Sequence, residues 1–260
     1  MKKRSLFCLG LAFIGWSHTL YAQTISAAGN EMSFDDPLTV SPSTSVGGFC
    51  VYNDVITIGA TSYDAIITID NISNALISDF DVNNTVNSNS SSHFSPSVLW
   101  TSANGYITYS IDFIEDGSAG APVPVTLGDI FLTAWDIDDV GPSGRFISSS
   151  DFSGYTLGSN TYLSYASTGL GVGTFQNATS GSNTSGTDGR SRVTLEYSST
   201  NSISLTIGAI GTGPHTYLIS GTNPQIWFPT TANESTIPTI NTFGSTASFF
   251  TCEGFFSTGQ

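Results

Sequence analysis

The stretch Asp129-Ile-Phe-Leu-Thr-Ala-Trp-Asp-Ile-Asp-Asp-Val-Gly141 indicates the fold class of this chain. Side chains of an extended strand point alternately to opposite faces. One face of this stretch carries Ile130, Leu132 and Ala134, and the other carries Phe131, Thr133 and Trp135. Both faces are apolar enough to be covered, as they are in a central strand of a layered β-protein. We therefore predict a buried strand that ends in the acidic segment following Trp135.

That acidic segment predicts a cation site. Asp136, Asp138 and Asp139 follow the strand directly, and carboxylates this close together repel one another unless a cation compensates them. Calcium prefers such oxygen ligands, so the expected cofactor is Ca²⁺, bound by these three residues together with Asp151. The alternative is a solvated acidic turn in which Arg145 pairs with one carboxylate.

The spacing of these carboxylates excludes an EF-hand. The segment imitates the first half of an EF-hand loop, but its twelfth position is Ile147 instead of the bidentate acid that the loop needs. A sandwich-type site would take its further acid from elsewhere, with Asp112, Glu115 and Asp116 as candidates besides Asp151.

The N-terminus predicts export. Three basic residues at positions 2–4 precede an apolar run from Leu6 to Trp16, which is too short for a permanent membrane span. Ala22 offers a small residue for cleavage, so residues 1–22 are expected to be a secretory signal peptide. The expected location is extracellular, with attachment to the cell surface through a region beyond Gln260.

The charge of the exported chain limits its partners. Without residues 1–22, three arginines and no lysine remain against 20 acidic residues, a net charge of about −17. Such a surface repels phosphate backbones and anionic membranes, so neither nucleic acid nor membrane insertion is expected. With 39% apolar and 12% aromatic residues, the chain can still build a real core.

Two cysteines, Cys50 and Cys252, remain after export to an oxidising space. A disulfide between them would close a long loop and stabilise the fold by roughly 4 kcal/mol in the chain-entropy model. The alternative is two unrelated thiols in different structural units, because spacing alone does not establish the required closeness.

Alternation and turn residues dominate from residue 23 onward, so we predict an all-β fold. About ten short strands over residues 47–228 fit a two-sheet antiparallel sandwich of jelly-roll type. Two hairpins are expected, Val51–Ile58 with Tyr63–Asp70 and Arg192–Tyr197 with Ser202–Gly208. Between them, Ile107, Tyr109, Ile111 and Phe113 alternate with Thr108, Ser110 and Asp112.

The composition changes on both sides of the predicted sandwich. Residues 23–46 are expected to form an N-terminal extension. Residues 229–239 are rich in Pro and Thr, which is typical of a linker. Residues 240–260 carry five phenylalanines that so short a span cannot bury alone, and they are expected to be the start of a further β module or a strand that docks on the sandwich.

The segment Ile237-Pro-Thr-Ile-Asn-Thr-Phe-Gly-Ser-Thr-Ala-Ser-Phe-Phe-Thr-Cys252, which leads to Ser257-Thr-Gly-Gln260, resembles the opening of a known module. That module occurs in tandem in long secreted and cell-surface proteins of the Bacteroidetes. The preceding domain, with its acidic exit from a Trp-bearing strand, is similar to β-sandwich modules of uncharacterised surface proteins. The resemblance implies the N-terminal part of a large adhesin-like protein exported by the type IX system.

Two classes of function remain open for such a module. The first is a structural or adhesive role at the cell surface, stabilised by calcium, with other surface proteins as partners. The second is carbohydrate binding to surface glycans, with Trp100 and Tyr106 as exposed rings on which sugars stack.

An enzyme is not expected, because His93 and His215 lie beside no nucleophile pattern. A glycoside hydrolase is the remote alternative. It would need two facing carboxylates, for which Asp112 and Glu196 are the strand acids available.

Overall fold

The computed structural model describes residues 24–35, 37–38, 42–82, 92–138, 144–158, 160–169, 171–177, 188–221 and 239–242. Nearly all regular structure in these residues is β-strand, and the one helical turn is the 3₁₀ segment Gly189–Ser191. The predicted all-β class is therefore confirmed.

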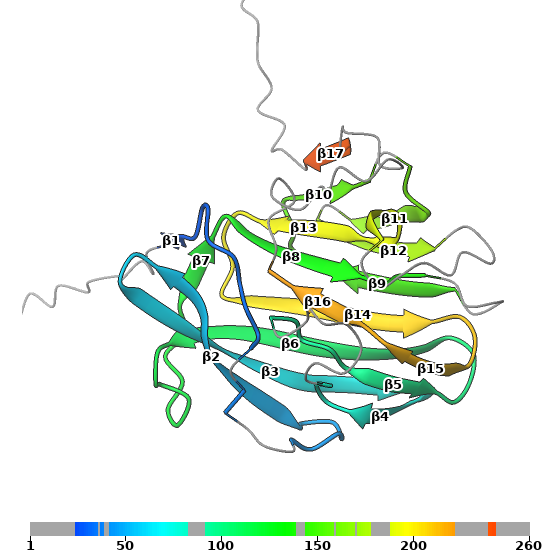
Figure 1. The fold of residues 1–260 in the computed structure, drawn as a ribbon, viewed down its shortest axis with the longest axis horizontal. Coiled ribbons are helices and arrows are strands. Elements are labelled where there is room, and N and C mark those ends of the chain that lie inside the picture. The colour runs from blue at the N-terminus through cyan, green and yellow to red at the C-terminus, as the bar shows by residue number, and fades with distance from the viewer. Residues whose placement is uncertain are drawn as a thin grey trace, which may run out of the picture.

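One layer is a seven-stranded sheet of antiparallel pairs, in the order β11-β12-β9-β14-β6-β3-β2 (Figure 1). Its strands are β2 (Phe49–Ile58), β3 (Thr61–Ser73), β6 (Gly105–Glu115), β9 (Arg145–Ser149), β11 (Leu163–Gly169), β12 (Val172–Asn177) and β14 (Ser202–Ala209).

The second layer combines a five-stranded sheet, β16-β8-β13-β10-β17, with a three-stranded sheet, β15-β5-β4. Its strands are β4 (Ala75–Asp79), β5 (Ser97–Trp100), β8 (Ile130–Trp135), β10 (Gly154–Leu157), β13 (Val193–Tyr197), β15 (Gly213–Thr216), β16 (Leu218–Ser220) and β17 (Thr239–Thr242). Phe94, just before β5, forms an antiparallel bridge with Ile219 of β16, and this bridge joins the two sheets edge to edge. Outside both layers, β1 (Thr24–Ser26) pairs in parallel with β7 (Thr126–Gly128).

The strand pairs nest in the manner of a jelly roll. β6 pairs with β14 and β9 with β12 in the seven-stranded sheet, while β8 pairs with β13 in the other layer. Successive strands thus pass from one sheet to the other, and the chain returns along the same path in reverse. The predicted jelly-roll-like sandwich is confirmed, and its core lies between the two layers.

Two strand predictions are confirmed in detail. β8 runs between β16 and β13, and Leu132 and Trp135 on its opposite faces are both buried. In β6, the row from Ile107 to Phe113 is fully buried, whereas Thr108, Ser110 and Asp112 are partly exposed. The alternation in the sequence therefore identified the core face of each strand correctly.

The two predicted hairpins have different outcomes. β2 and β3 form a hairpin whose two-residue loop begins at Gly59, with a positive φ of 67° that glycine adopts without strain. The second predicted hairpin is wrong, because β13 pairs with β8 and β10 whereas β14 pairs with β6 and β9. The link between β13 and β14 crosses from one layer to the other, where Thr200 and Leu127 exchange backbone hydrogen bonds. The apolar rows of β13 and β14 therefore both point into the core from opposite sheets.

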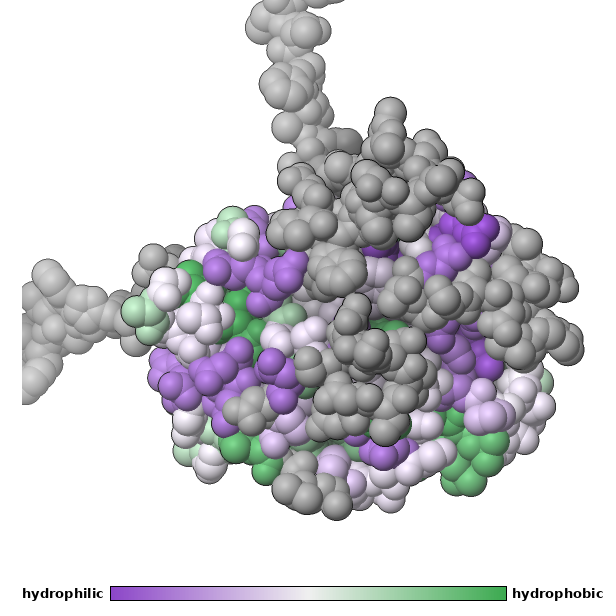
Figure 2. Space-filling view, in the orientation of Figure 1, coloured by the Kyte–Doolittle hydropathy of each residue, from purple (hydrophilic) through white to green (hydrophobic). Residues whose placement is uncertain are grey.

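Two further features concern the edges and surface of the sandwich. Thr239–Thr242 pairs antiparallel with β10 at the edge of the second layer, seen beyond β10 in Figure 1. On the face shown in Figure 2, hydrophobic residues outside the grey atoms form separate small patches among hydrophilic ones. The described residues contain no helix with the length and apolarity needed to cross a membrane.

Candidate functional site

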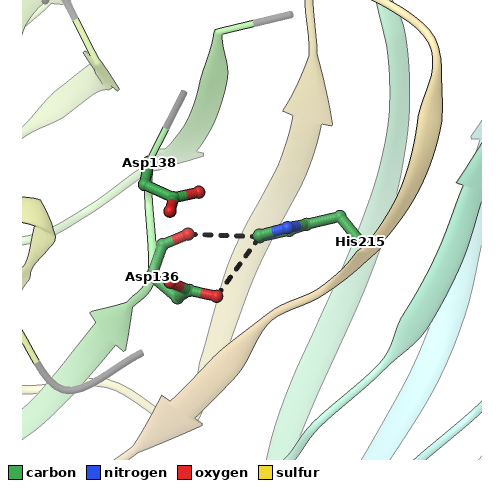
Figure 3. A group of neighbouring side chains, drawn as sticks. All are labelled: Asp136, Asp138 and His215. Carbon is green, nitrogen blue, oxygen red and sulfur yellow. Dashed lines mark hydrogen bonds and ion pairs between the residues drawn. The ribbon is translucent and has the colours of Figure 1, made fainter. Parts of the chain in front are cut away.

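Three side chains that can bind a metal ion converge where β8 ends. Asp136 follows β8 directly in a left-handed conformation (φ 61°), and Asp138 lies two residues further on and is only 2% exposed. His215 of β15, in the three-stranded sheet, faces both of them (Figure 3). One donor atom from each residue lies within 4.8 Å of the others.

Hydrogen bonds fix the position of this group. The Nε2 atom of His215 lies 3.1 Å from the backbone oxygen of Asp136 and 4.0 Å from its carboxylate. Because a carbonyl oxygen only accepts, Nε2 carries the proton in this bond, and a metal ion bound beside the two aspartates would require that proton to move to Nδ1. Between the aspartates, Ile137 donates its backbone N–H to Ser191 and accepts a bond from Asn177 through its backbone oxygen.

Burial shifts both titrating groups toward their neutral forms. It raises the pKa of Asp136 to about 7, with help from the charge of Asp138 and against the opposing charge of Arg145. Burial also lowers the pKa of His215 to about 3, and Arg145 acts in the same direction. Near pH 7 the site therefore holds a neutral imidazole, which is the form that binds a metal.

Arg145 and the ring of Tyr217 lie beside this group. Arg145 is 2% exposed and donates from Nη2 to the backbone oxygen of Pro214, while its Nε and Nη1 have no hydrogen-bond partner among the described residues. The ring of His215 packs edge-on against Tyr217 at 4.5 Å between centroids, and the Tyr217 hydroxyl donates to Gly208. These contacts hold the imidazole in place.

The structure brings two of the four predicted ligand residues together and places a third apart from them. Asp136 and Asp138 do lie together, while Asp139 lies outside the described residues. Asp151 follows the C-terminal end of β9, whereas Arg145 begins this strand. Asp151 is exposed, accepts a hydrogen bond from Ser150 and does not belong to the group. Its prediction as a ligand is wrong, because the extended strand β9 separates it from Asp136.

His215 was missed as a member of this group because it lies 79 residues from Asp136 in sequence. The pairing of β16 with β8, in which Leu218 lies opposite Trp135, brings it to the site. No local sequence pattern signals such a contact.

The alternative interpretation was that Arg145 pairs with a carboxylate. Among the described residues, Arg145 forms no ion pair within 4.0 Å. The guanidinium acts on Asp136 only as a nearby charge.

Trp100 is not a surface ring, contrary to the prediction. It is 1% exposed, and its indole packs edge-on against Tyr217 at 6.3 Å between centroids. A Cβ atom on Gly105 would lie 2.8 Å from the indole, so the glycine that suggested an exposed turn instead makes room for the buried ring. Tyr106, in contrast, is partly exposed.

Cys50 is 1% exposed, and its Sγ lies 3.8 Å from the backbone oxygen of Val51. Cys252 lies outside the described residues, so the disulfide stays a prediction.

A second candidate site is the outer face of the seven-stranded sheet, called the outer face below. Because β9, β14, β6 and β3 are paired in register, their solvent-facing side chains form rows across the strands. Two of these rows consist of uncharged polar residues, Ser148, Thr206, Thr108 and Asn71 in one and Ser204, Ser110 and Thr68 in the next.

Each end of these rows has a distinct feature. At one end, Gly208 lies between Phe146 and Tyr106 in the register, and both rings are partly exposed. At the other end, a pocket of about 340 Å³ is lined by Ile66, Thr68, Asp112, Phe113, Ile114, Pro122, Pro124, Asn201 and Ser202.

No protein-family model matches this sequence, and no curated protein matches it. Among solved structures, the N-terminal domain of the Streptococcus gordonii adhesin Sgo0707 is similar, with 10% identity and a TM-score of 0.45 over 73% of this chain and 48% of that chain. Glucan binding protein C of Streptococcus mutans is similar with 12% identity and a TM-score of 0.41, over 69% of this chain and 59% of that chain. The chain thus spans less than two thirds of either protein. Similarity at this level does not transfer a function from one protein to another.

Proposed function

We propose that this chain is a secreted, non-enzymatic β-sandwich module with a structural and adhesive role at the cell surface. The observation that carries the proposal is the outer face, where uncharged polar side chains, most of them hydroxyls, form rows across paired strands of the sheet. Adhesion needs a broad, preorganised surface, because binding then costs little ordering of the protein. The predicted leader and the acidic composition support a location outside the cell.

The positions of the strand acids weaken the alternative of a glycoside hydrolase. Asp112 lies on the solvent-facing side of β6, and Glu196 lies on the solvent-facing side of β13 in the other layer. The whole core separates these two carboxylates, whereas glycosidases hold theirs about 5–9.5 Å apart around the scissile bond.

The adhesive role can be tested with beads that carry residues 23–260. Retention under flow would be measured on mucin, on a cultured epithelial monolayer and on the cell envelope of the source organism. We expect retention that is lost when Thr206→Asp and Ser148→Asp place charge in the middle of the outer face. The matched control is Glu196→Gln on the opposite layer, which should retain full adhesion. Absence of retention on all three surfaces, or equal retention of the charged variant, would refute the adhesive role.

A divalent cation held by Asp136, Asp138 and His215 is the second part of this proposal. Two carboxylates and a neutral imidazole within 4.8 Å support it. An imidazole suits Zn²⁺ and other transition metals, whereas Ca²⁺ takes oxygen ligands, so the group favours Zn²⁺ over the Ca²⁺ expected from the sequence. The ion would offset the repulsion between the two aspartates at the rim of the sandwich.

Thermal unfolding with Ca²⁺, Zn²⁺ or EDTA tests the cation. A ligand at about 100 times its Kd stabilises the folded state by about 2.7 kcal/mol, which raises the Tm by about 5–10 °C for a domain of this size. We expect this shift with Zn²⁺ and its loss in His215→Asn, while the control Asp151→Asn keeps it. A shift with Ca²⁺ that survives His215→Asn would exclude His215 as a ligand, and no shift with either ion would exclude the site.

A further inference from the structure

We infer that the outer face binds a neutral glycan chain that lies along β6, from the ring of Phe146 to the pocket at Asp112. The inference rests on the adhesive role proposed above and names the ligand of the same surface. It is argued from three consecutive parts of this face and from its charge.

The first part is an aromatic ring supported by a glycine. A Cβ atom on Gly208 would lie 2.1 Å from Cζ of Phe146, so the outer end of this ring lies over the bare backbone of Gly208. Both Phe146 and Tyr106, which lie on either side of Gly208 in the register, remain partly exposed, and the Tyr106 hydroxyl accepts a hydrogen bond from Asn71. Sugar rings stack their C–H groups on such apolar ring surfaces. The two exposed aromatic rings can therefore act as a stacking platform for a glycan.

The second part is the pair of hydroxyl rows in the middle of the face. Thr108 and Thr206 share a hydrogen bond of 3.0 Å across β6 and β14, and Ser110 donates to Asp70 at 3.2 Å. Each hydroxyl can donate one bond and accept others. These side chains therefore keep capacity for the hydroxyl groups of a sugar while their positions are fixed by the sheet.

The third part is the pocket of about 340 Å³ at the far end. Its polar lining offers the Asp112 carboxylate and the Asn201 amide, and its apolar lining offers Ile66 and Pro122. The carboxylate can accept a hydrogen bond from one hydroxyl of a sugar ring, and the amide can donate to a neighbouring hydroxyl. Hydrogen bonds to an ionised acceptor are the stronger ones. The volume is at the lower end of the range for ligand sites, about 300–1,000 Å³, which suits a single sugar residue.

The separation of the two ends indicates a chain and not a monosaccharide. Tyr106 and Asp112 lie six residues apart on β6, a distance of about 20 Å at about 3.3 Å per residue. A ligand that contacts both ends must therefore contain several sugar residues in a row.

Charge selects neutral glycans. The acidic groups at this face are Asp70 and Asp112, and the exported chain carries a net charge of about −17. The three arginines of the exported chain lie elsewhere, with Arg145 on the core side of β9 and Arg190 and Arg192 at the entrance to β13. Sialylated, sulfated or uronic acid chains would be repelled.

Affinity electrophoresis of residues 23–260 tests this inference. The gels would contain dextran, laminarin, mannan or amylose as neutral probes, and heparin or alginate as anionic ones. We expect retardation by at least one neutral polysaccharide and none by either anionic one. The binding should not weaken between 50 and 500 mM NaCl, because it does not depend on ion pairs.

Three variants locate the site. Gly208→Ala pushes the Phe146 ring off the sheet with little effect on the fold, since the far end of a flexible side chain gives way. This variant, Phe146→Ala and Asp112→Asn should each weaken retardation at least tenfold, with melting temperatures within about 4 °C of the parent chain. Glu196→Gln on the opposite layer is the control and should bind normally.

Three results would overturn the inference: no retardation by any neutral polysaccharide, retardation by heparin, or binding that none of the three variants changes. If the beads described above still adhere while no glycan binds, the adhesive role stands and a protein partner replaces the glycan. If adhesion and glycan binding are both absent, both proposals fall.

Discussion

Replacing Asp136 with Asn should stabilise the protein at alkaline pH and have almost no effect at pH 4. In the folded chain, burial raises the pKa of the Asp136 carboxyl to about 7, against an ordinary value of 3.8. Ionisation is therefore harder in the folded state than in the unfolded state. The destabilisation is absent below pH 3.8, grows as the pH rises from 4 to 7, and is complete above 7. Asn removes the charge and still tolerates the left-handed backbone at this position.

The size of the effect follows from the pKa difference of about 3 units. Each unit corresponds to 1.36 kcal/mol, so the ionised carboxylate costs at most about 4 kcal/mol above pH 7. The Asp136 side chain keeps 21% of its surface in contact with solvent, which reduces the expected gain in the variant to about 2–4 kcal/mol. Burial lowers the pKa of His215 to about 3, so the folded chain becomes less stable as the pH drops below 6.5. His215 is present in both the parent and the variant, so this contribution cancels in the difference between them.

Urea unfolding of the parent chain and Asp136→Asn between pH 4 and pH 8.5, with EDTA present, measures this difference. EDTA is needed because a bound cation would itself stabilise the ionised carboxylate. The control is Asp151→Asn, an exposed acid with a similar left-handed φ of 63°, which should change stability by less than about 0.5 kcal/mol at every pH. A gain below about 0.5 kcal/mol at pH 8, or a gain that does not vary with pH, would refute the assignment of a desolvated carboxylate to this position.

Two further predictions concern buried groups. Trp100→Ala should destabilise the chain by about 3–5 kcal/mol in urea unfolding, because the indole fills the core against Tyr217; a normal unfolding midpoint would mean that Trp100 is not buried. The carboxylate of Asp64 is fully buried and accepts the backbone N–H groups of Asp54 and Gly117. Asp64→Asn should cost about 1–3 kcal/mol and speed hydrogen exchange at those two amides, since an amide group leaves one of them without an acceptor; unchanged exchange rates would contradict this role.

The strand faces could be read from the sequence because they depend on a local rule. Side chains alternate with a period of two, so the apolar row from Ile107 to Phe113 had to face the core whatever its partners were. The same rule identified β8 as a strand buried on both sides and placed Asp136 and Asp138 at its exit. Composition likewise established the acidic surface without any structure.

Strand pairing and contacts between residues distant in the chain could not be predicted from the sequence pattern. Alternation assigns β13 and β14 a core face but not a sheet, and the two strands lie in opposite layers although only four residues separate them. Trp100 next to a turn looked exposed, yet contact with Gly105 and Tyr217 buries it. His215 joins the aspartates only because β16 pairs with β8.

The sequence by itself thus determined the class of fold, the inward face of the main strands and the charge of the surface, because each depends on residues near one another in the chain. The tertiary structure alone decided which strands pair, which ring is hidden and which imidazole meets the carboxylates. Those outcomes depend on contacts between distant residues, and the free energy that selects them comes from filling one shared core.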